Sequence, residues 1–259
     1  LIDEKLIRKL DYKHLHFFKD IDNQLLNHPF DPLNQYSVPY TWEVIGLGID
    51  TQAYDFSPIN ISWSEVFHPS TVKNRVAMVN DPIEAIDIAA RFLFDDKNIL
   101  NKNDKEEIAN LLKAQKKYVE AYTELRGDYL LSSKSTSIAV IPSPYGLQCT
   151  NKNSHITFNL PKEFTFISIE NVCIPICSRN NDLAYEFIQY LFRPEIMARE
   201  SELFYDFPSL MTARCLLKHN RVINKTLEDL KNYNGDLLFF RTNFEEKEIS
   251  NLWVGVKGY

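Results

Sequence analysis

Short β-rich runs alternate with amphipathic segments along the chain, and this alternation limits the possible folds more than any other feature. It indicates βαβ units, in which mostly parallel sheets are covered by helices on both faces. The sequence therefore predicts an α/β fold. The runs predicted to be strands are residues 44–49, 76–79, 137–141, 156–160 and 171–176.

Two helices are predicted from a 3.6-residue periodicity of apolar side chains. Asp104 and Glu107 are expected to form a capping box at the start of the first helix, and Arg193-Pro194 is expected to close the second. The predicted stripe of the first helix consists of Ile108, Leu111, Leu112, Gln115, Tyr118, Val119 and Tyr122. The second helix, residues 183–191, is expected to share one face among Leu183, Ala184, Phe187, Ile188 and Leu191.

Size and charge narrow the class of protein. The 259 residues are 44% hydrophobic, which is enough for two medium cores and favours two compact lobes. A formal net charge of −6 argues against a nucleic-acid partner, which would require clustered Lys and Arg, and is compatible with capture of a cation. No run of about 18 apolar residues predicts a membrane span, and residues 1–10 lack the continuous apolar stretch of a secretory signal.

The sequence contains no recognisable binding motif for a metal ion or a nucleotide cofactor. The cysteines have neither CxxC spacing nor neighbouring histidines, which disfavours a zinc site. They are predicted to be small buried apolar side chains. The seven glycines form no phosphate cradle. The four cysteines are Cys149, Cys173, Cys177 and Cys215.

Three stretches, taken in order, carry a resemblance to a known family. The first is PFDP at residues 29–32 with YSVPYTW at 36–42 and GLGI at 46–49. The second is SWSEVFHP at 62–69 with RVAM at 75–78 and the Asp81-x-x-Glu84 pair. The third is ENVCIP at 170–175 with AYEFI at 184–188 and RPE at 193–195. No single stretch is diagnostic, but their order and spacing up to about residue 217 resemble the spermidine/putrescine-binding proteins of bacterial ABC importers.

The resemblance implies a two-lobed, type II periplasmic-binding-protein-like fold with mixed sheets covered by helices and two hinge crossings. Lobe one would comprise residues 1–50 and 168–230, and lobe two residues 51–167 and 231–259. The family has a long segment before the point where this sequence begins, so we expect the first lobe to be incomplete as numbered. In open α/β folds ligands bind beyond the carboxyl ends of strands, often where two domains face one another.

The function implied is that of a periplasmic, non-catalytic solute-binding component of a polyamine (spermidine/putrescine) importer. It would capture a small cationic ligand in the interlobe cleft, without a cofactor, and deliver it to an inner-membrane ABC permease. A polyamine is a flexible apolar chain with ammonium groups. Its receptor therefore needs carboxylates at fixed separations and aromatic rings that cover the methylenes.

The resemblance matches Asp81 and Glu84 to paired acids that hold one amine, and Glu170 to an acidic hinge residue that grips another. Tyr40 and Trp42 lie in the matched SVPYTW run and are candidates to face the ligand, with core packing as the alternative. Asp81-Pro82-Ile83-Glu84 also has the pattern of an N-cap, a proline at N1 and a glutamate at N3. Capping and cation binding are compatible, because a helix N-terminus keeps carboxylates ionised.

Some positions depart from the family. Pro142 and Ser168 align with family tryptophans, so two aromatic side chains of the family's ligand site are replaced in this sequence. Ser168 is still predicted to contact the ligand, because of its position. A family tyrosine aligns with either Tyr205 or Asp206. These departures leave open a receptor of the same fold for a different small solute, or a sensor that binds a partner without transport.

An enzymatic function is disfavoured. Glycoside hydrolysis needs carboxylates on opposite sides of a bond, whereas Asp81 and Glu84 are adjacent on one helical turn. The sequence thus predicts a binding protein.

Overall fold

The computed structural model describes residues 1–53, 61–68, 75–95, 97, 99–124, 126–217 and 220–258. Pro69, the last residue of the SWSEVFHP segment, lies outside these ranges. The chain divides into two compact units. The first unit comprises Leu1–Glu43 and Ser168–Asn232, and the second comprises Val44–Ile167 and Tyr233–Tyr259.

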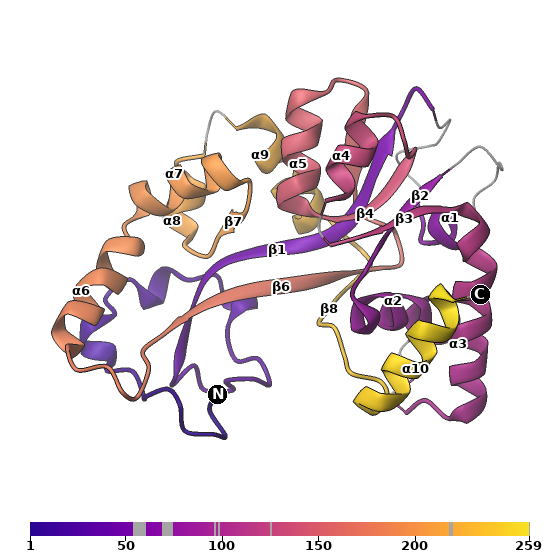
Figure 1. Cartoon of the computed structure of the whole chain (residues 1–259). Coiled ribbons are helices and arrows are strands. Elements are labelled where there is room, and N and C mark those ends of the chain that lie inside the picture. The colour runs from indigo at the N-terminus through magenta and orange to yellow at the C-terminus, as the bar shows by residue number, and fades with distance from the viewer. Residues whose placement is uncertain are drawn as a thin grey trace. The chain divides into compact units, whose positions relative to one another are not determined.

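Two long strands continue from one unit into the other (Figure 1). They are β1 (Ser37–Asp50) and β6 (Phe164–Cys173). Both are longer than predicted, because the sequence pattern showed only the second half of β1 and the last part of β6. The predicted run at residues 171–176 also extends three residues past the end of β6, at Cys173.

A mixed sheet forms the centre of the second unit. Strand β2 (Val76–Val79) pairs in parallel with β3 (Val119–Thr123) and with β4 (Ile138–Pro142). Strand β1 runs antiparallel to β4, from Ile45 opposite Pro142 to Ile49 opposite Ile138. The full order is β3-β2-β4-β1-β6-β8, with β5 (Ile156–Asn159) paired to β1 and β8 (Asp236–Leu238) parallel to β6.

Helices cover both faces of this sheet (Figure 1). Val76 and Met78 of β2 belong to the core cluster that also contains residues of α2, α3 and α10. Ala77, between them, belongs to the cluster that contains residues of α4 and α5. Burial on both faces explains why β2 and β4 are apolar at every position, as strands of covered parallel sheets are. The helices are α1 (Ser64–Phe67), α2 (Pro82–Phe94), α3 (Lys102–Gln115), α4 (Gly127–Ser132), α5 (Ser143–Lys152) and α10 (Glu246–Lys257), with a 3₁₀ turn at Lys116–Tyr118.

Two glycines admit the ring of Phe158 between β1 and α5. A Cβ atom at Gly146 of α5 would lie 2.3 Å from Phe158 Cδ2, and one at Gly46 of β1 would lie 2.5 Å from Phe158 Cζ. Both distances are far below van der Waals contact, so each position accepts only glycine without a shift of the ring.

The first unit is built from the starting half of β1, the end of β6 and short helices. Strand β7 (Phe207–Pro208) pairs antiparallel with β1, and a bridge between Ile21 and Leu210 attaches the amino-terminal segment. The helices are α6 (Asn181–Leu191), α7 (Pro194–Phe204), α8 (Met211–Arg214) and α9 (Arg221–Lys231), with 3₁₀ turns at Tyr12–His14, Phe18–Asp20 and Asn23–Leu25. The buried apolar side chains of this unit include Leu15, Ile21, Leu25, Val38, Trp42, Phe192, Met197, Phe207, Leu210 and Ile223.

The α/β fold class is confirmed, whereas two details of the first predicted helix are wrong. Helix α3 ends at Gln115, and Val119 and Tyr122 lie in β3, where β2 pairs with their backbone. The prediction extended the helix too far because apolar side chains keep a spacing of three or four residues beyond Gln115, although the chain changes from helix to strand there. The capping box consists of Asn101 and Asp104 instead of Asp104 and Glu107.

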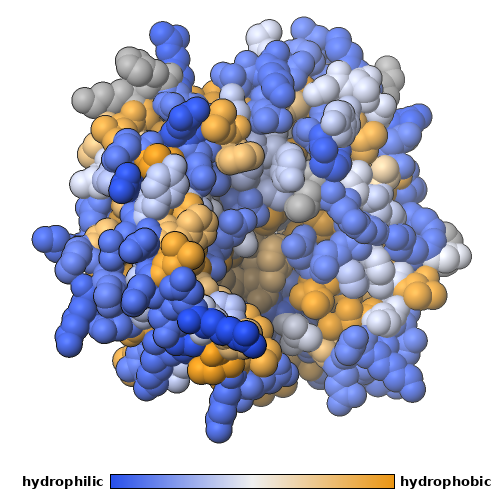
Figure 2. Space-filling view, turned by 60° about the vertical axis from the view of Figure 1, so that its left-hand side comes forward, coloured by the Kyte–Doolittle hydropathy of each residue, from blue (hydrophilic) through white to orange (hydrophobic). Residues whose placement is uncertain are grey.

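The predicted apolar face of α6 is wrong in part. Ile188 is buried as predicted, but Leu183 and Phe187 are each 58% exposed, and Tyr185, which lies outside the predicted face, is buried. Charged and polar side chains dominate the view in Figure 2, with separate apolar areas between them. No helix in the described part of the chain is both long enough and apolar enough to cross a lipid bilayer.

The cysteines do not behave as one class. Cys149 is buried as predicted, but Cys177 and Cys215 are exposed and Cys173 is half-buried. All four are free thiols. The prediction of buried apolar cysteines was therefore wrong for the last three, because residue type alone does not place a side chain in the core.

Candidate functional site

Tyr40, a predicted ligand residue, is joined to helix α7. It lies in the first half of β1, and its hydroxyl donates a hydrogen bond to the carboxylate of Glu200. The edge of its ring packs on Phe192, with 5.4 Å between the ring centroids. Burial, the bond with Glu200 and nearby negative charges raise the pKa of Tyr40 well above its ordinary value of 10.0. The phenol therefore stays protonated at every physiological pH.

Two further acids act on Tyr40 through their charges. Glu170 of β6 accepts a hydrogen bond from Thr41 Oγ1 at 3.3 Å, and Asp206 follows the end of α7. Burial, together with the charges of Glu170 and Glu200, raises the pKa of Asp206 to about 6. The Oδ1 atom of Asp206 is buried and has no hydrogen-bond partner among the described residues. The three carboxyl groups thus form one electrostatically coupled cluster.

Across the described ranges, no Lys or Arg forms a salt bridge with Glu170, Glu200 or Asp206. Nor are three or more His, Cys, Asp or Glu side chains in that part of the chain placed to hold a metal ion. The negative charges of these carboxylates can attract an organic cation, whose N–H groups would donate hydrogen bonds to them.

Trp42 lies in the core of the first unit. Its side chain is only 2% exposed and packs against Phe207, with ring centroids 4.8 Å apart. The guanidinium of Arg214 lies 5.5 Å from the centre of the indole ring and also pairs with Asp22 at 2.5 Å. These contacts favour the packing alternative that the sequence left open for Trp42.

The last two residues of the predicted set differ in their surroundings. Ser168 of β6 is exposed. Tyr205 is half-buried and ends α7 in the left-handed conformation, with φ 66° and ψ 18°. That turn directs the chain into Asp206 and β7, so Tyr205 sets the position of the acid that follows it.

Asp81 and Glu84 lie together in the second unit, at the start of α2. Asp81 caps the helix by accepting hydrogen bonds from the backbone N–H groups of Ile83 (2.8 Å) and Glu84 (3.0 Å). The helix begins directly after β2, at the carboxyl end of a parallel strand, where α/β folds place their ligands. Burial, followed by the charge of Asp81, raises the pKa of Glu84 to about 7. The N-cap and Pro82 at N1 are present as predicted. The expectation that the helix N-terminus keeps Glu84 ionised is wrong, because burial and the charge of Asp81 outweigh the helix dipole.

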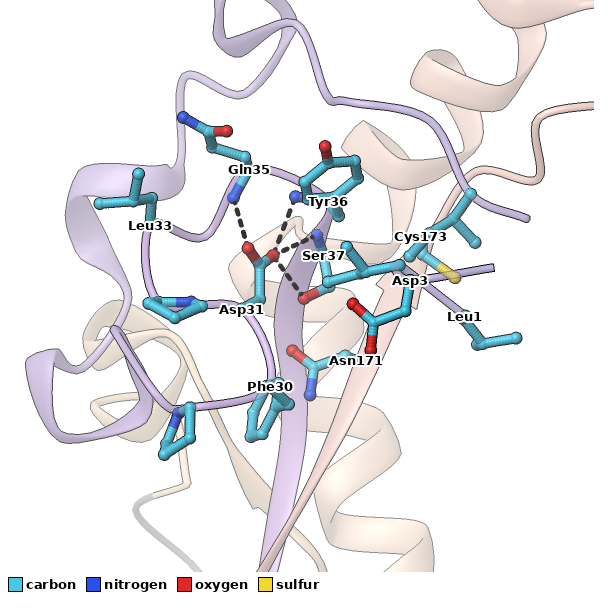
Figure 3. Close-up of a pocket in the computed structure, with 14 residues that line it drawn as sticks. Leu1, Asp3, Phe30, Asp31, Leu33, Gln35, Tyr36, Ser37, Asn171 and Cys173 are labelled. Carbon is cyan, nitrogen blue, oxygen red and sulfur yellow. Dashed lines mark hydrogen bonds between the residues drawn. The ribbon is translucent and has the colours of Figure 1, made fainter. Parts of the chain in front are cut away.

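A separate cavity of about 660 Å³ lies within the first unit, and none of the predicted ligand residues lines it (Figure 3). Asp31 is the buried acid on its wall. The carboxylate of Asp31 accepts hydrogen bonds from the backbone N–H groups of Gln35, Tyr36 and Ser37 at 2.8–2.9 Å and from Ser37 Oγ at 3.0 Å. The carboxylate of Asp31 is thus satisfied by its own loop, and the other acid that lines the cavity is the exposed Asp3.

Comparison with known proteins shows the family of this chain. The profile of the bacterial extracellular solute-binding protein family matches residues 1–232. The chain belongs to this family.

Curated relatives of this solute-binding protein bear polyamine names. A spermidine/putrescine-binding periplasmic protein of Escherichia coli (strain K12) is 28% identical over 234 residues, which cover 88% of this chain and 66% of the relative. A putrescine/agmatine-binding protein of Pseudomonas aeruginosa is 27% identical over 218 residues, which cover 78% of this chain and 59% of the relative. The chain thus spans at most about 66% of the length of these relatives.

Solved structures give the fold. A spermidine/putrescine ABC transporter substrate-binding protein of Streptococcus pneumoniae superimposes with a TM-score of 0.83 and 22% identity, covering 100% of this chain and 80% of its own. This likeness confirms the type II periplasmic-binding-protein fold predicted from the three stretches.

Sequence reasoning missed two acids of the first-unit cluster. Glu200 carried no signal, because it lies inside a helix and its partner Tyr40 is 160 residues away. The sequence offers Asp206 only as an alternative to Tyr205 in an ambiguous alignment.

Proposed function

We propose that the chain is the solute-binding component of a polyamine ABC importer, capturing a small organic cation such as spermidine or putrescine. The observation that carries this proposal is the cluster of Glu170, Glu200 and Asp206 around Tyr40, which has no salt-bridged cation in the described part of the chain. The polyamine names of the relatives support the same ligand class.

Each unit contains acidic side chains that could bind an ammonium group. In the first unit Glu170 and its neighbours would accept hydrogen bonds from one ammonium group. In the second unit Asp81 and Glu84 would attract another, and the burial of Glu84 strengthens its interaction with a cation by reducing screening by water. Tyr40 adds a hydroxyl oxygen beside the first group.

The finer parts of the proposal follow from the family. A periplasmic location is supported by the names of the relatives, and delivery to an inner-membrane ABC permease by the importer family to which such proteins belong. Binding without catalysis fits a family defined by solute binding.

A different solute is the second candidate, favoured by the residues that replace the family tryptophans. Ser168 is exposed and, like Pro142, offers no aromatic ring to cover methylenes. A structure of the same fold, described as a GABA receptor, shares 15% identity with this chain.

Isothermal titration calorimetry tests the proposal directly. The protein is titrated with putrescine, spermidine, thiamine and a set of neutral and acidic amino acids. Binding of a di- or triamine at least a hundredfold tighter than any other ligand is the expected result. Tight binding of a neutral or acidic ligand, or no heat from any amine, would refute it.

A further inference from the structure

The hydrogen bond between Tyr40 and Glu200 has a defined direction. A carboxylate without a proton can only accept, so the phenolic proton of Tyr40 points at Glu200. The phenol itself stays protonated, because burial and the surrounding carboxylates oppose the phenolate. The hydroxyl proton is therefore already used, and the oxygen has only its lone pairs left for another partner.

The ring that carries this hydroxyl is held in place. Phe192 packs against the ring of Tyr40, and the backbone oxygen of Tyr40 accepts a hydrogen bond from the N–H of Ser209 at 3.0 Å. Glu200 lies on α7, which ends in the turn that places Asp206. These contacts hold the ring and the backbone of Tyr40, and the hydrogen bond to Glu200 sets the direction of its hydroxyl group.

We propose that Glu200 is a positioning and specificity-determining residue, which makes the Tyr40 hydroxyl an acceptor for an N–H group of the ligand. This inference rests on the proposed function, since it concerns the same cation site. A hydroxyl that donates to a carboxylate is polarised, and its oxygen becomes a better acceptor. An ammonium or guanidinium group has the donors that fit. A ligand carboxylate would meet lone pairs and the negative charges of Glu170 and Asp206.

Glu200 therefore selects an amine over an acid at the same end of the ligand. When the polar groups of a site can only accept hydrogen bonds, a ligand group that also can only accept is strongly rejected. Binding such a ligand would leave a buried polar group without a partner. In this chain that commitment comes from a residue outside the predicted ligand set.

The test compares putrescine with 4-aminobutyrate, which has the same four-carbon chain but a carboxylate in place of one ammonium group. Calorimetry is performed on the wild-type chain and on the Glu200→Ala, Glu200→Gln and Tyr40→Phe variants. Glu202→Gln is the matched control, because it removes one negative charge from an exposed position of the same helix.

Glu200→Ala should weaken putrescine binding about tenfold, the value of one charged hydrogen bond, and should reduce the preference for putrescine over 4-aminobutyrate by a further tenfold or more. The released hydroxyl can then donate to a carboxylate. Glu200→Gln keeps an acceptor for the hydroxyl and should retain most of the preference. Glu202→Gln should change neither quantity more than twofold.

Equal losses of preference in Glu200→Ala and Glu200→Gln would show that Glu200 acts by charge alone, and would overturn the inference while leaving the proposed function intact. In the Tyr40→Phe background the Ala and Gln variants should behave alike, and a difference there would also overturn it. A wild-type protein that binds no amine would refute the proposed function as well. Circular dichroism melting curves identify any variant that fails to fold, and Tyr40→Phe provides the test if Glu200→Ala does.

Discussion

Replacement of Glu84 by glutamine should make the unliganded protein more stable at pH 8 and weaken its binding of a cation. Folding raises the pKa of this carboxyl from 4.5 to about 7. Between these two pH values the native state binds more protons than the unfolded state, so its stability falls as the pH rises. Above pH 7 the full cost applies, and the shift corresponds to about 3 kcal/mol.

Part of the Glu84 side chain remains in contact with water, which screens the charge, so we expect about 1–2 kcal/mol rather than the full value. Glutamine has the same shape and no charge, and it should recover this amount at pH 8. At pH 4 the wild-type side chain is itself neutral, so the two proteins should be equally stable. Amine affinity at pH 8 should fall by about 1–3 kcal/mol, the value of a charged hydrogen bond.

Urea unfolding, followed at pH 4 and pH 8 for the wild-type and Glu84→Gln proteins, measures the difference without reference to other titrating groups. The expected pattern is a stability gain for the variant at pH 8 alone, together with a loss of amine affinity. A variant that is less stable than the wild type at both pH values, with unchanged affinity, would show that Glu84 serves the helix terminus only.

Three other changes test the structure. Asp81→Ala should lower the free energy of unfolding by about 1 kcal/mol through loss of the α2 cap, whereas Asp81→Asn should retain most of it, and equal losses in urea unfolding would contradict the capping geometry. Gly146→Ala should lower the free energy of unfolding by about 1–3 kcal/mol, because its methyl group would overlap the ring of Phe158. Gly255→Ala is the control and should raise the free energy of unfolding by up to about 1 kcal/mol, because a Cβ atom there meets no atom within 4 Å. Similar melting temperatures for the two variants would refute the close packing. In the Glu84→Gln background, where Glu84 no longer titrates, amine affinity should fall roughly tenfold as the pH drops through about 6 and Asp206 becomes protonated. Calorimetry from pH 5 to 7.5 should show no such step once Asp206→Asn is added.

Sequence periodicity predicted elements best where local and tertiary preferences agree. Residues 76–79 were predicted as a strand and form β2, because four consecutive apolar side chains suit a strand covered on both faces. Helix α6 was predicted within two residues at its start, but its buried face only in part, since Ile188 meets the core as predicted whereas Tyr185 is buried instead of Phe187. The end of α3 was missed because pairing with β2 takes over at Val119.

The sequence by itself determined the α/β class and the family, because alternating periodicities and three ordered stretches are local properties of the chain. It also placed Asp81 and Glu84 at a helix start, since capping depends on neighbours within three residues. Only the tertiary structure decided that Trp42 is packed in the core and that Glu200 meets Tyr40. Contacts between residues far apart in the chain depend on how strands and helices pack, and no local pattern of side chains records them.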